Sequence, residues 1–363
     1  MSEVILLPME PAAYAFQLDG KPVKCEVFGH GHINHTLKLT TDTGAEYVLQ
    51  QINTYVFKDP VQLMENVSAV TRFLHERVDD PRHALHMLPA RDGKYYHVDE
   101  LNQYWRCYDF VGGFCLDLPE TDEDFYQSAI AFGRFQTLLS DFSAETLYET
   151  IPEFHNTTDR YRQFRKSVTA DAVGRAAGVK ADIDFLLERE DLACTLQAMR
   201  QDGLLPLRVT HNDTKLNNVL LDRVTRKALC VLDLDTVMPG LSLYDFGDSI
   251  RFGAATAAED EPDLSKMSLD LHLFEVYTRG YLEAASALTD TEIAMLPMGA
   301  LAVTLELATR FLKDYLDGDL YFKTAYPEHN LVRARTQMKL AWDMQHKWDE
   351  MNRIVALVNQ ARR

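Results

Sequence analysis

The sequence lacks the features that mark secreted and membrane-bound proteins. Its five cysteines are scattered over 363 residues and form no CxxC pair, so we expect reduced thiols and a cytoplasmic location rather than a disulfide framework. No apolar run is long enough to span a bilayer. The N-terminus has neither the basic segment nor the small-residue cleavage site of a signal peptide. We therefore expect no membrane segment and no secretory leader.

Basic residues are scarce relative to acidic ones. The chain has 37 Lys and Arg against 55 Asp and Glu, a formal net charge of -18, and no stretch rich in Lys or Arg offsets it. Such a charge repels nucleic acid and anionic lipid, so we expect neither as a partner. An anionic ligand such as a nucleotide would need local neutralisation of its charge by metal ions and backbone amides.

The first hundred residues predict short strands separated by turns, with one helix between them. The helix is indicated by Asp59 as its N-cap, by Pro60 at the first helical position, and by apolar residues at helical spacing up to Leu74. Segments rich in β-branched and aromatic residues predict strands at 23–28, 36–39, 46–52, 94–98 and 103–110.

The character of the sequence changes at Gly112-Gly113, after which helical patterns dominate. Apolar residues at helical spacing predict long helices at 123–139, 182–201, 268–288, 297–316 and 332–358. One β-hairpin, 218–222 with 228–235, interrupts them. We therefore divide the chain into a first lobe, 1–111, and a second lobe, 112–363, and expect ligands to bind in the cleft between them.

The most informative segment is His211-Asn-Asp-Thr-Lys-Leu-Asn-Asn218, which contains the pattern H-x-D-x-x-x-x-N. Phosphoryl transfer needs a carboxylate that orients the attacking hydroxyl and accepts its proton, together with hard oxygen ligands for Mg²⁺. Asp213 fits the first role. Asn218 and Asp233 fit the second, because the hairpin returns Asp233 beside Asn218. A lone Asp or His more often forms a turn, but the complete pattern predicts a phosphotransferase.

A further acid in this region needs a separate interpretation. Asp245-Phe246-Gly247 spells the metal-binding tripeptide of protein kinases, but Asp233 already stands at the end of the hairpin strand, where the metal ligand is expected. We therefore expect Asp245 to brace the catalytic loop through hydrogen bonds to its backbone. His211 and Asp235 are expected to support the site indirectly as well.

Segments along most of the chain resemble the N-acetylhexosamine 1-kinases, a family within the aminoglycoside phosphotransferase and choline kinase superfamily. The resemblance covers about residues 23–348 and rests on the segments Phe28-Gly-His-Gly-His-Ile-Asn34, Val56-Phe-Lys-Asp-Pro60, Leu63-Met-Glu-Asn66, His211–Asn218, Pro239–Arg251 and Tyr321–Asn330. It implies an α+β, two-lobe protein-kinase-like fold with a β-rich N-terminal lobe and a mainly helical C-terminal lobe. It also implies ATP as phosphate donor, Mg²⁺ as cofactor, and the anomeric hydroxyl of GlcNAc or GalNAc as acceptor.

The nucleotide half of the site is expected in the first lobe. Gly29, Gly31 and Asn34 belong to a loop between two strands. Such a loop could lie over the phosphates of a nucleotide or could be a plain hairpin turn. The catalytic motif favours the phosphate-binding loop. Most members of the superfamily place a lysine on the third strand, paired with a helix glutamate. Gln50 occupies that strand position and Glu65 the helix position. Because Gln50 carries no charge, metal ions, loop amides or another cation must neutralise the phosphates.

The resemblance also implies contacts to the sugar. His32 in the glycine loop, Arg310 in the helix at 297–316, and Tyr321 beyond that helix would contact ring hydroxyls and the N-acetyl group. Composition alone would make Arg310 a solvated side chain. The reacting hydroxyl of the sugar would bond to Asp213.

Two alternatives remain open at the level of the sequence. Another small substrate of the superfamily, such as choline, homoserine or an aminoglycoside, would also suit so acidic a chain. A pseudokinase that binds nucleotide without turnover would account for the missing lysine, although the presence of Asp213, Asn218 and Asp233 argues against it. In each case we expect a monomer or a weak dimer.

Overall fold

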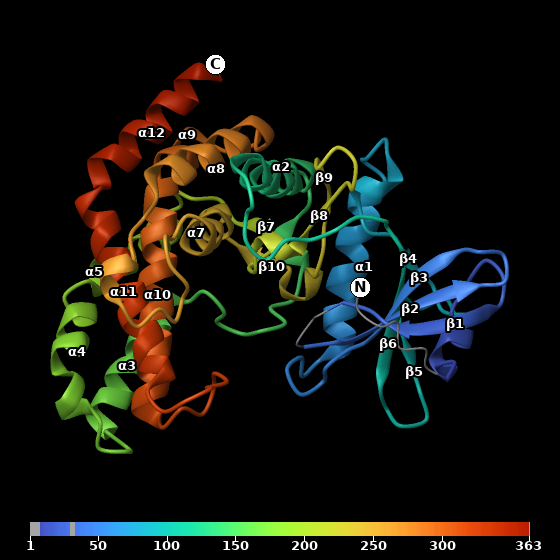
Figure 1. Ribbon diagram of the computed structural model, residues 1–363, viewed down its shortest axis with the longest axis horizontal. Helices are drawn as coiled ribbons and strands as arrows, with labels where there is room; N and C mark the ends of the chain where they lie inside the picture. Colours follow the sequence, from blue (N-terminus) through green and yellow to red (C-terminus); the bar gives the residue numbers. More distant parts are fainter. Residues whose placement is uncertain (1–7, 30–32, 363) are drawn as a thin grey trace. The chain divides into compact units, whose positions relative to one another are not determined.

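The computed structural model describes residues 8–29 and 33–362, which divide into two compact units (Figure 1). The first unit contains the residues up to 114 together with 141–152 and 220–238, and the second contains 115–140, 153–219 and the residues from 239 onward. Neither unit is continuous, in contrast to the expected division after residue 111. The reason is that apolar residues of the hairpin at 219–231 pack against Leu85 and Val111 of the first unit.

The first unit is built on an antiparallel sheet with the strand order β1-β2-β3-β6-β4, and β5 pairs with β6 on the side of this path. Helix α1 follows β3 in the chain. The bounds of these elements are β1 Pro22–Val27, β2 His35–Thr41, β3 Glu46–Gln51, α1 Pro60–His75, β4 Met87–Leu88, β5 His97–Val98 and β6 Tyr104–Asp109. The start of α1 is confirmed, because the side chain of Asp59 accepts a hydrogen bond from the Gln62 backbone N–H.

The two faces of this sheet carry different side chains. Leu37, Leu39, Leu49 and Cys107 alternate along β2, β3 and β6 and are buried in one apolar cluster. The intervening positions point to the opposite face, where Thr36, Gln50 and Arg106 lie directly across from one another in the strand register. The sheet therefore has one apolar face and one face that carries a polar ladder.

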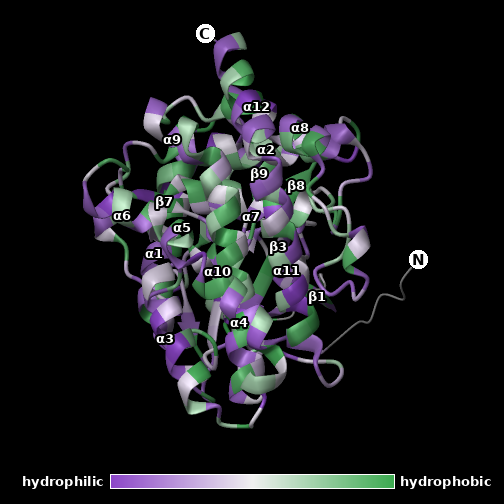
Figure 2. Ribbon diagram, turned by 90° about the vertical axis from the view of Figure 1, so that its left-hand side faces the viewer, coloured by the Kyte–Doolittle hydropathy of each residue, from purple (hydrophilic) through white to green (hydrophobic). Residues whose placement is uncertain are grey.

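The second unit is mainly helical. Its longer helices are α2 Asp122–Leu138, α3 Thr157–Ala170, α7 Ser242–Gly253, α8 Leu271–Ala284, α10 Leu296–Asp317, α11 His329–His346 and α12 Trp348–Ala361, and its shorter ones are α4 Lys180–Leu187, α5 Glu190–Ala193, α6 Thr195–Gln201 and α9 Asp290–Ala294. Helix α10 packs against α3, α7 and α11 and is hydrophobic over most of its length (Figure 2). None of the helices in the described ranges is both long and apolar enough to cross a membrane.

Two short strand pairs complete the described structure. Strand β7, Arg208–Thr210, pairs with β10, Met238–Gly240, and β8, Val219–Leu221, pairs with β9, Ala228–Val231. The second pair confirms the hairpin that the sequence predicts. The segment from 211 to 218, which contains the H-x-D-x-x-x-x-N pattern, therefore connects β7 to β8.

Several predicted helices differ from those observed. The segment 182–201 forms α4, α5 and α6 instead of one helix, and 332–358 is divided between α11 and α12 near Lys347. The side chain of Lys347 donates hydrogen bonds to Ser268 and to the Leu269 carbonyl, which are contacts from outside the helices. Helices α3 and α7 were not predicted, because each has a large share of polar residues or glycine.

Glycines bring α7 and α10 unusually close together. A Cβ atom added to Gly247 would lie 2.3 Å from the Gly299 carbonyl oxygen, and one added to Gly299 would lie 2.5 Å from the Leu243 carbonyl oxygen. Both neighbours are backbone atoms, so they cannot rotate away. The glycine of the Asp-Phe-Gly tripeptide is thus explained by helix packing, and the tripeptide lies inside α7.

We predict that Gly247→Ala destabilises the protein by about 1–3 kcal/mol, because the added methyl group must push two backbones apart. Urea unfolding followed by circular dichroism measures the change. Gly178→Ala is the matched control, since a Cβ at Gly178 meets nothing within 4 Å. Equal stability of the two variants would show that the α7–α10 contact is not tight.

Candidate active site

The catalytic loop, residues 211–218, presents a partly exposed carboxylate at Asp213. The Asn218 amide nitrogen donates to the Asp213 carbonyl at 2.8 Å and to its Oδ2 at 3.1 Å. The ammonium group of Lys215 lies 2.8 Å from Oδ1 of the same carboxylate. Because the Asn218 nitrogen is turned toward Asp213, its amide oxygen is the atom available to a metal ion. The carboxylate is therefore fixed by an amide on one oxygen and by a cation on the other.

The base of the loop is held by Asp245, which is fully buried in the first turn of α7. Its Oδ2 accepts from the His211 backbone N–H at 2.9 Å, and its Oδ1 accepts from the Asn212 backbone N–H at 2.8 Å. The Gln136 amide donates to Oδ2 at 2.9 Å. Burial raises the pKa of Asp245, and these hydrogen bonds oppose that shift. One carboxylate thus satisfies two consecutive backbone donors at a point where Asn212 adopts a positive φ of 65°.

Two more residues of α7 bind the next position of the loop. Asp248 Oδ2 accepts from the Thr214 backbone N–H at 3.2 Å, and the Ser249 hydroxyl donates to the Thr214 carbonyl at 2.8 Å. The Thr214 hydroxyl in turn donates to the Asp245 carbonyl at 2.6 Å. Residues three and four apart share one face of a helix, so a single polar face of α7 holds the backbone that precedes and follows Asp213.

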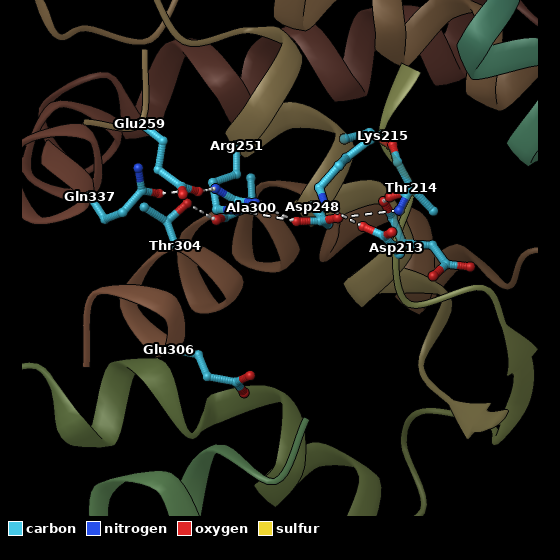
Figure 3. Close-up of polar contacts among 12 residues, drawn as sticks. Asp213, Thr214, Lys215, Asp248, Arg251, Glu259, Ala300, Thr304, Glu306 and Gln337 are labelled. Carbon is cyan, nitrogen blue, oxygen red and sulfur yellow. Dashed lines mark hydrogen bonds and ion pairs between the residues drawn. The ribbon is translucent and has the colours of Figure 1, made fainter. Parts of the chain in front are cut away.

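A chain of alternating charges runs from the catalytic loop past α7 to Glu259 (Figure 3). The guanidinium group of Arg251 lies 2.8 Å from the Asp248 carboxylate and 2.7 Å from that of Glu259, and the Arg251 side chain is buried. Burial opposes the ionised form of Asp248, but Arg251 and Lys215 lower its pKa below the usual value. Partial burial likewise opposes the charge of Lys215, but Asp213 and Asp248 raise its pKa. The lysine is therefore positively charged at neutral pH.

Lys215 is a residue of this site that the sequence interpretation did not select. Its signal was present, because it lies two positions after Asp213 within the catalytic pattern. A lysine in a loop is usually solvated, and only the contact with Asp213 distinguishes this one.

Asp233, the expected metal acid, follows β9 in the first unit. It adopts the left-handed conformation with φ 53° and begins the 3-10 turn Leu234–Thr236. Asp235 lies in that turn and is buried, where it forms an ion pair with Arg106 and accepts from the Asn34 amide at 2.6 Å. The Asn34 amide oxygen accepts from the Asn53 backbone N–H at 3.0 Å. Asn34, Gln50 and Asp235 are thus brought into one network, with Arg106 between the last two.

The other residues of the glycine loop and of the predicted nucleotide side lie in different surroundings. Gly29 has a positive φ of 78°, a conformation that favours glycine. Gly31 and His32 lie outside the described residues. Glu65 is exposed, and its carboxylate accepts a hydrogen bond from the Tyr148 hydroxyl. The helix glutamate is therefore engaged with Tyr148, while Gln50 bonds to Thr36 and Arg106.

On the expected sugar side, Arg310 of α10 lies among aromatic rings. Its guanidinium carbon is 5.7 Å from the ring of Phe154, 5.9 Å from that of Tyr321 and 5.5 Å from that of Phe322. The Tyr321 side chain is 70% exposed, so it remains open to a ligand. The structure therefore brings together Arg310 and Tyr321, two of the residues predicted to contact the sugar.

The described residues contain no cluster of three or more His, Cys, Asp or Glu side chains that would hold a metal by themselves. The proposed donors, an amide oxygen of Asn218 and the carboxylate of Asp233, are nevertheless hard oxygen atoms. Mg²⁺ in kinases takes only one or two protein ligands of this kind and completes its shell with water and phosphate oxygens. The donor chemistry therefore fits Mg²⁺.

The profile of the phosphotransferase enzyme family matches residues 24–281. The chain belongs to this family. Its fold is accordingly kinase-like, with an antiparallel-sheet N-terminal lobe and a helical C-terminal lobe, as predicted. The family match makes it a phosphotransferase.

Solved structures with the same fold are distant in sequence. An aminoglycoside phosphotransferase from Alicyclobacillus acidocaldarius is 14% identical, with a TM-score of 0.66 over 97% of this chain and 98% of that one. A microcompartment-associated aminopropanol kinase is 18% identical, with a TM-score of 0.60 over 94% and 97% of the two chains. An amicoumacin kinase in complex with AMP-PNP, Ca²⁺ and Ami is 13% identical, with a TM-score of 0.58 over 93% and 91%.

We predict that Asp245→Asn lowers stability by about 1–3 kcal/mol, because an amide offers one acceptor oxygen where two buried N–H groups need one each. Turnover should fall with the loss of loop order, whereas the Mg²⁺ concentration for half-maximal activity should stay within twofold. Thermal unfolding and a Mg²⁺ titration measure these effects, with the exposed Asp202→Asn as control. A larger effect on Mg²⁺ affinity than on stability would identify Asp245 as a metal ligand.

Proposed function

We propose that the protein is a cytoplasmic ATP-dependent kinase that phosphorylates an N-acetylhexosamine, GlcNAc or GalNAc, at the anomeric hydroxyl. The observation that carries the kinase assignment is the Asp213 carboxylate, fixed between the Asn218 amide and the Lys215 ammonium on a loop that α7 holds. The family match supports the reaction type. The choice of an N-acetylhexosamine as acceptor rests on the resemblance of the motifs and on the residues around Arg310.

Asp213 acts on the acceptor in this proposal. Its carboxylate accepts a hydrogen bond from the attacking hydroxyl and takes the proton as the new bond between oxygen and the γ-phosphorus forms. The bond between the γ-phosphorus and the oxygen of the β-phosphate breaks, and ADP leaves with that electron pair. Bound Mg²⁺ would neutralise the phosphate charge, and Asn218 and Asp233 would hold it.

Lys215 supplies positive charge beside the reacting centre. Its ammonium group lies at the carboxylate that the substrate must approach, so it is well placed to offset negative charge on the transferred phosphoryl group. Gly29, Gly31, Asn34, Gln50 and Glu65 remain the proposed nucleotide-side residues. The absence of a lysine at position 50 is compatible with turnover when Lys215 and the metal carry this charge.

The hydrogen-bond donors around Arg310 favour an oxygen-rich acceptor. Burial and the positive charge of Arg310 lower the pKa of Arg160, and the negative charge of Glu306 opposes that shift. Among the described residues, the Arg160 Nε atom has no hydrogen-bond partner. Guanidinium N–H groups suit the hydroxyl and acetyl oxygens of a sugar, which accept hydrogen bonds, whereas the quaternary ammonium of choline cannot accept one. Arg310, Tyr321 and His32 are therefore proposed to contact the sugar.

We predict that Asp213→Asn lowers kcat by roughly 10²–10⁴-fold, because the amide keeps the shape of the side chain but cannot accept the proton. An ADP-release assay measures kcat, and circular dichroism verifies the fold. Asn217→Ala is the control, since Asn217 is exposed in the same loop. A variant that retains most of its turnover would exclude Asp213 as the base.

The decisive experiment compares free and blocked sugars. The anomeric hydroxyl is the most acidic of the ring hydroxyls and is therefore best matched to a carboxylate base. We predict that GlcNAc or GalNAc is phosphorylated, that 6-deoxy-GlcNAc still reacts, and that the methyl glycosides are inert. Phosphorus NMR of the product should show coupling to the anomeric proton. A 6-phosphate product, or turnover of a methyl glycoside, would reject the 1-kinase assignment.

A further inference from the structure

A polar ladder crosses the face of the N-terminal sheet opposite its apolar cluster. Thr36, Gln50 and Arg106 stand directly across from one another on β2, β3 and β6. The Gln50 amide nitrogen donates to the Thr36 hydroxyl at 2.9 Å, and the Arg106 Nε donates to the Gln50 amide oxygen at 3.0 Å. The glutamine at the place expected for a lysine thus orients a cation on the adjacent strand.

The charge of Arg106 is already used within the protein. The residue is only 1% exposed, and its guanidinium forms an ion pair with Asp235, which is 2% exposed. The second oxygen of Asp235 accepts from Asn34, the residue that precedes β2. Both partners are therefore out of water and paired with each other, and the charge of Arg106 also acts on Asp233. Arg106 is thus not a free cation for phosphates, and Asp235 is not a free ligand for a metal ion.

This ion pair fixes the turn that carries Asp233. Asp235 is two residues beyond Asp233, and the turn between them starts from the left-handed backbone of Asp233. Asp adopts that conformation at modest cost, so the contacts of the turn decide where its carboxylate lies. Asp235 provides such contacts, because its carboxylate is tied to β6 through Arg106 and to the start of β2 through Asn34.

We propose that Arg106 is a positioning residue for the divalent cation of MgADP and MgATP. Its buried ion pair with Asp235 locks the turn after β9, so that Asp233 is presented as the carboxylate ligand and Asp235 is withheld from coordination. The proposal rests on the proposed function, in which Asp233 binds the metal. It gives Gln50 a role as the acceptor that orients the guanidinium.

The test measures ADP binding to the full-length protein by calorimetry, first in EDTA and then over a Mg²⁺ titration. Arg106→Gln should raise the Mg²⁺ concentration that half-maximally tightens ADP binding by at least tenfold. Its affinity for ADP in EDTA should stay within twofold of the wild type. Arg106→Lys, which keeps the charge, should recover part of the Mg²⁺ response. Arg82→Gln, which breaks an exposed Arg–Asp pair in the same unit, should match the wild type.

Other results would overturn the proposal in distinguishable ways. A folded Arg106→Gln variant with an unchanged Mg²⁺ response would remove the positioning role. A loss of ADP affinity in EDTA would make Arg106 a phosphate contact instead. If Asp235→Asn weakens the Mg²⁺ response as much as Asp233→Asn while Arg106→Gln leaves it unchanged, Asp235 is itself a ligand.

Two controls keep these results interpretable. Asp233→Asn suits the left-handed backbone, since Asn adopts it readily. A wild-type Mg²⁺ response in that variant would reject the metal assignment of the proposed function, independently of Arg106. If Arg106→Gln does not fold, the uncharged pair Arg106→Gln with Asp235→Asn leaves no unpaired buried charge, and the same Mg²⁺ criteria apply to it.

Discussion

Two buried backbone N–H groups, those of His211 and Asn212, must find acceptors where the chain turns into the catalytic loop, and Asp245 supplies both. The neighbouring Thr214 backbone is satisfied by Asp248 and Ser249 from the same helix face. The position of Asp213 is therefore decided by α7 more than by its own contacts. An apolar face on α7 would pack equally well but would leave the loop without partners.

The two buried arginines of the described residues, Arg106 and Arg251, are each paired with a buried carboxylate. Arg251 and Lys215 flank Asp248, and Arg106 is matched to Asp235. A charge removed from water is costly unless it is paired, and loss of one partner is more costly than loss of both. Other buried carboxylates, such as Asp245 and Asp314, accept hydrogen bonds from backbone N–H groups instead. The acidic surplus of this chain, with its net charge of -18, therefore extends to buried positions.

The sequence was informative where function and local geometry constrain the same residues. The catalytic pattern around Asp213, the N-cap at Asp59 and the β8–β9 hairpin were all recognisable from residue type and spacing. Helix α7 was not, because its polar residues point inward to a loop and so break the amphipathic pattern. The sequence does not reveal the role of Arg106, because that role depends on the strand register beside Gln50 and on an ion pair with Asp235, which is distant in the chain.

The glycine contact between α7 and α10 limits how the enzyme can acquire new substrates. Helix α10 carries Arg310, and α7 carries the residues that hold the catalytic loop. With Gly247 and Gly299 in backbone contact, α10 cannot shift away from α7 to make room beside Arg310, the proposed sugar contact, without displacing the loop as well. Evolution or design of a different acceptor preference would then proceed by exchange of side chains on α10 and in the segment after it, with the helix axis left in place.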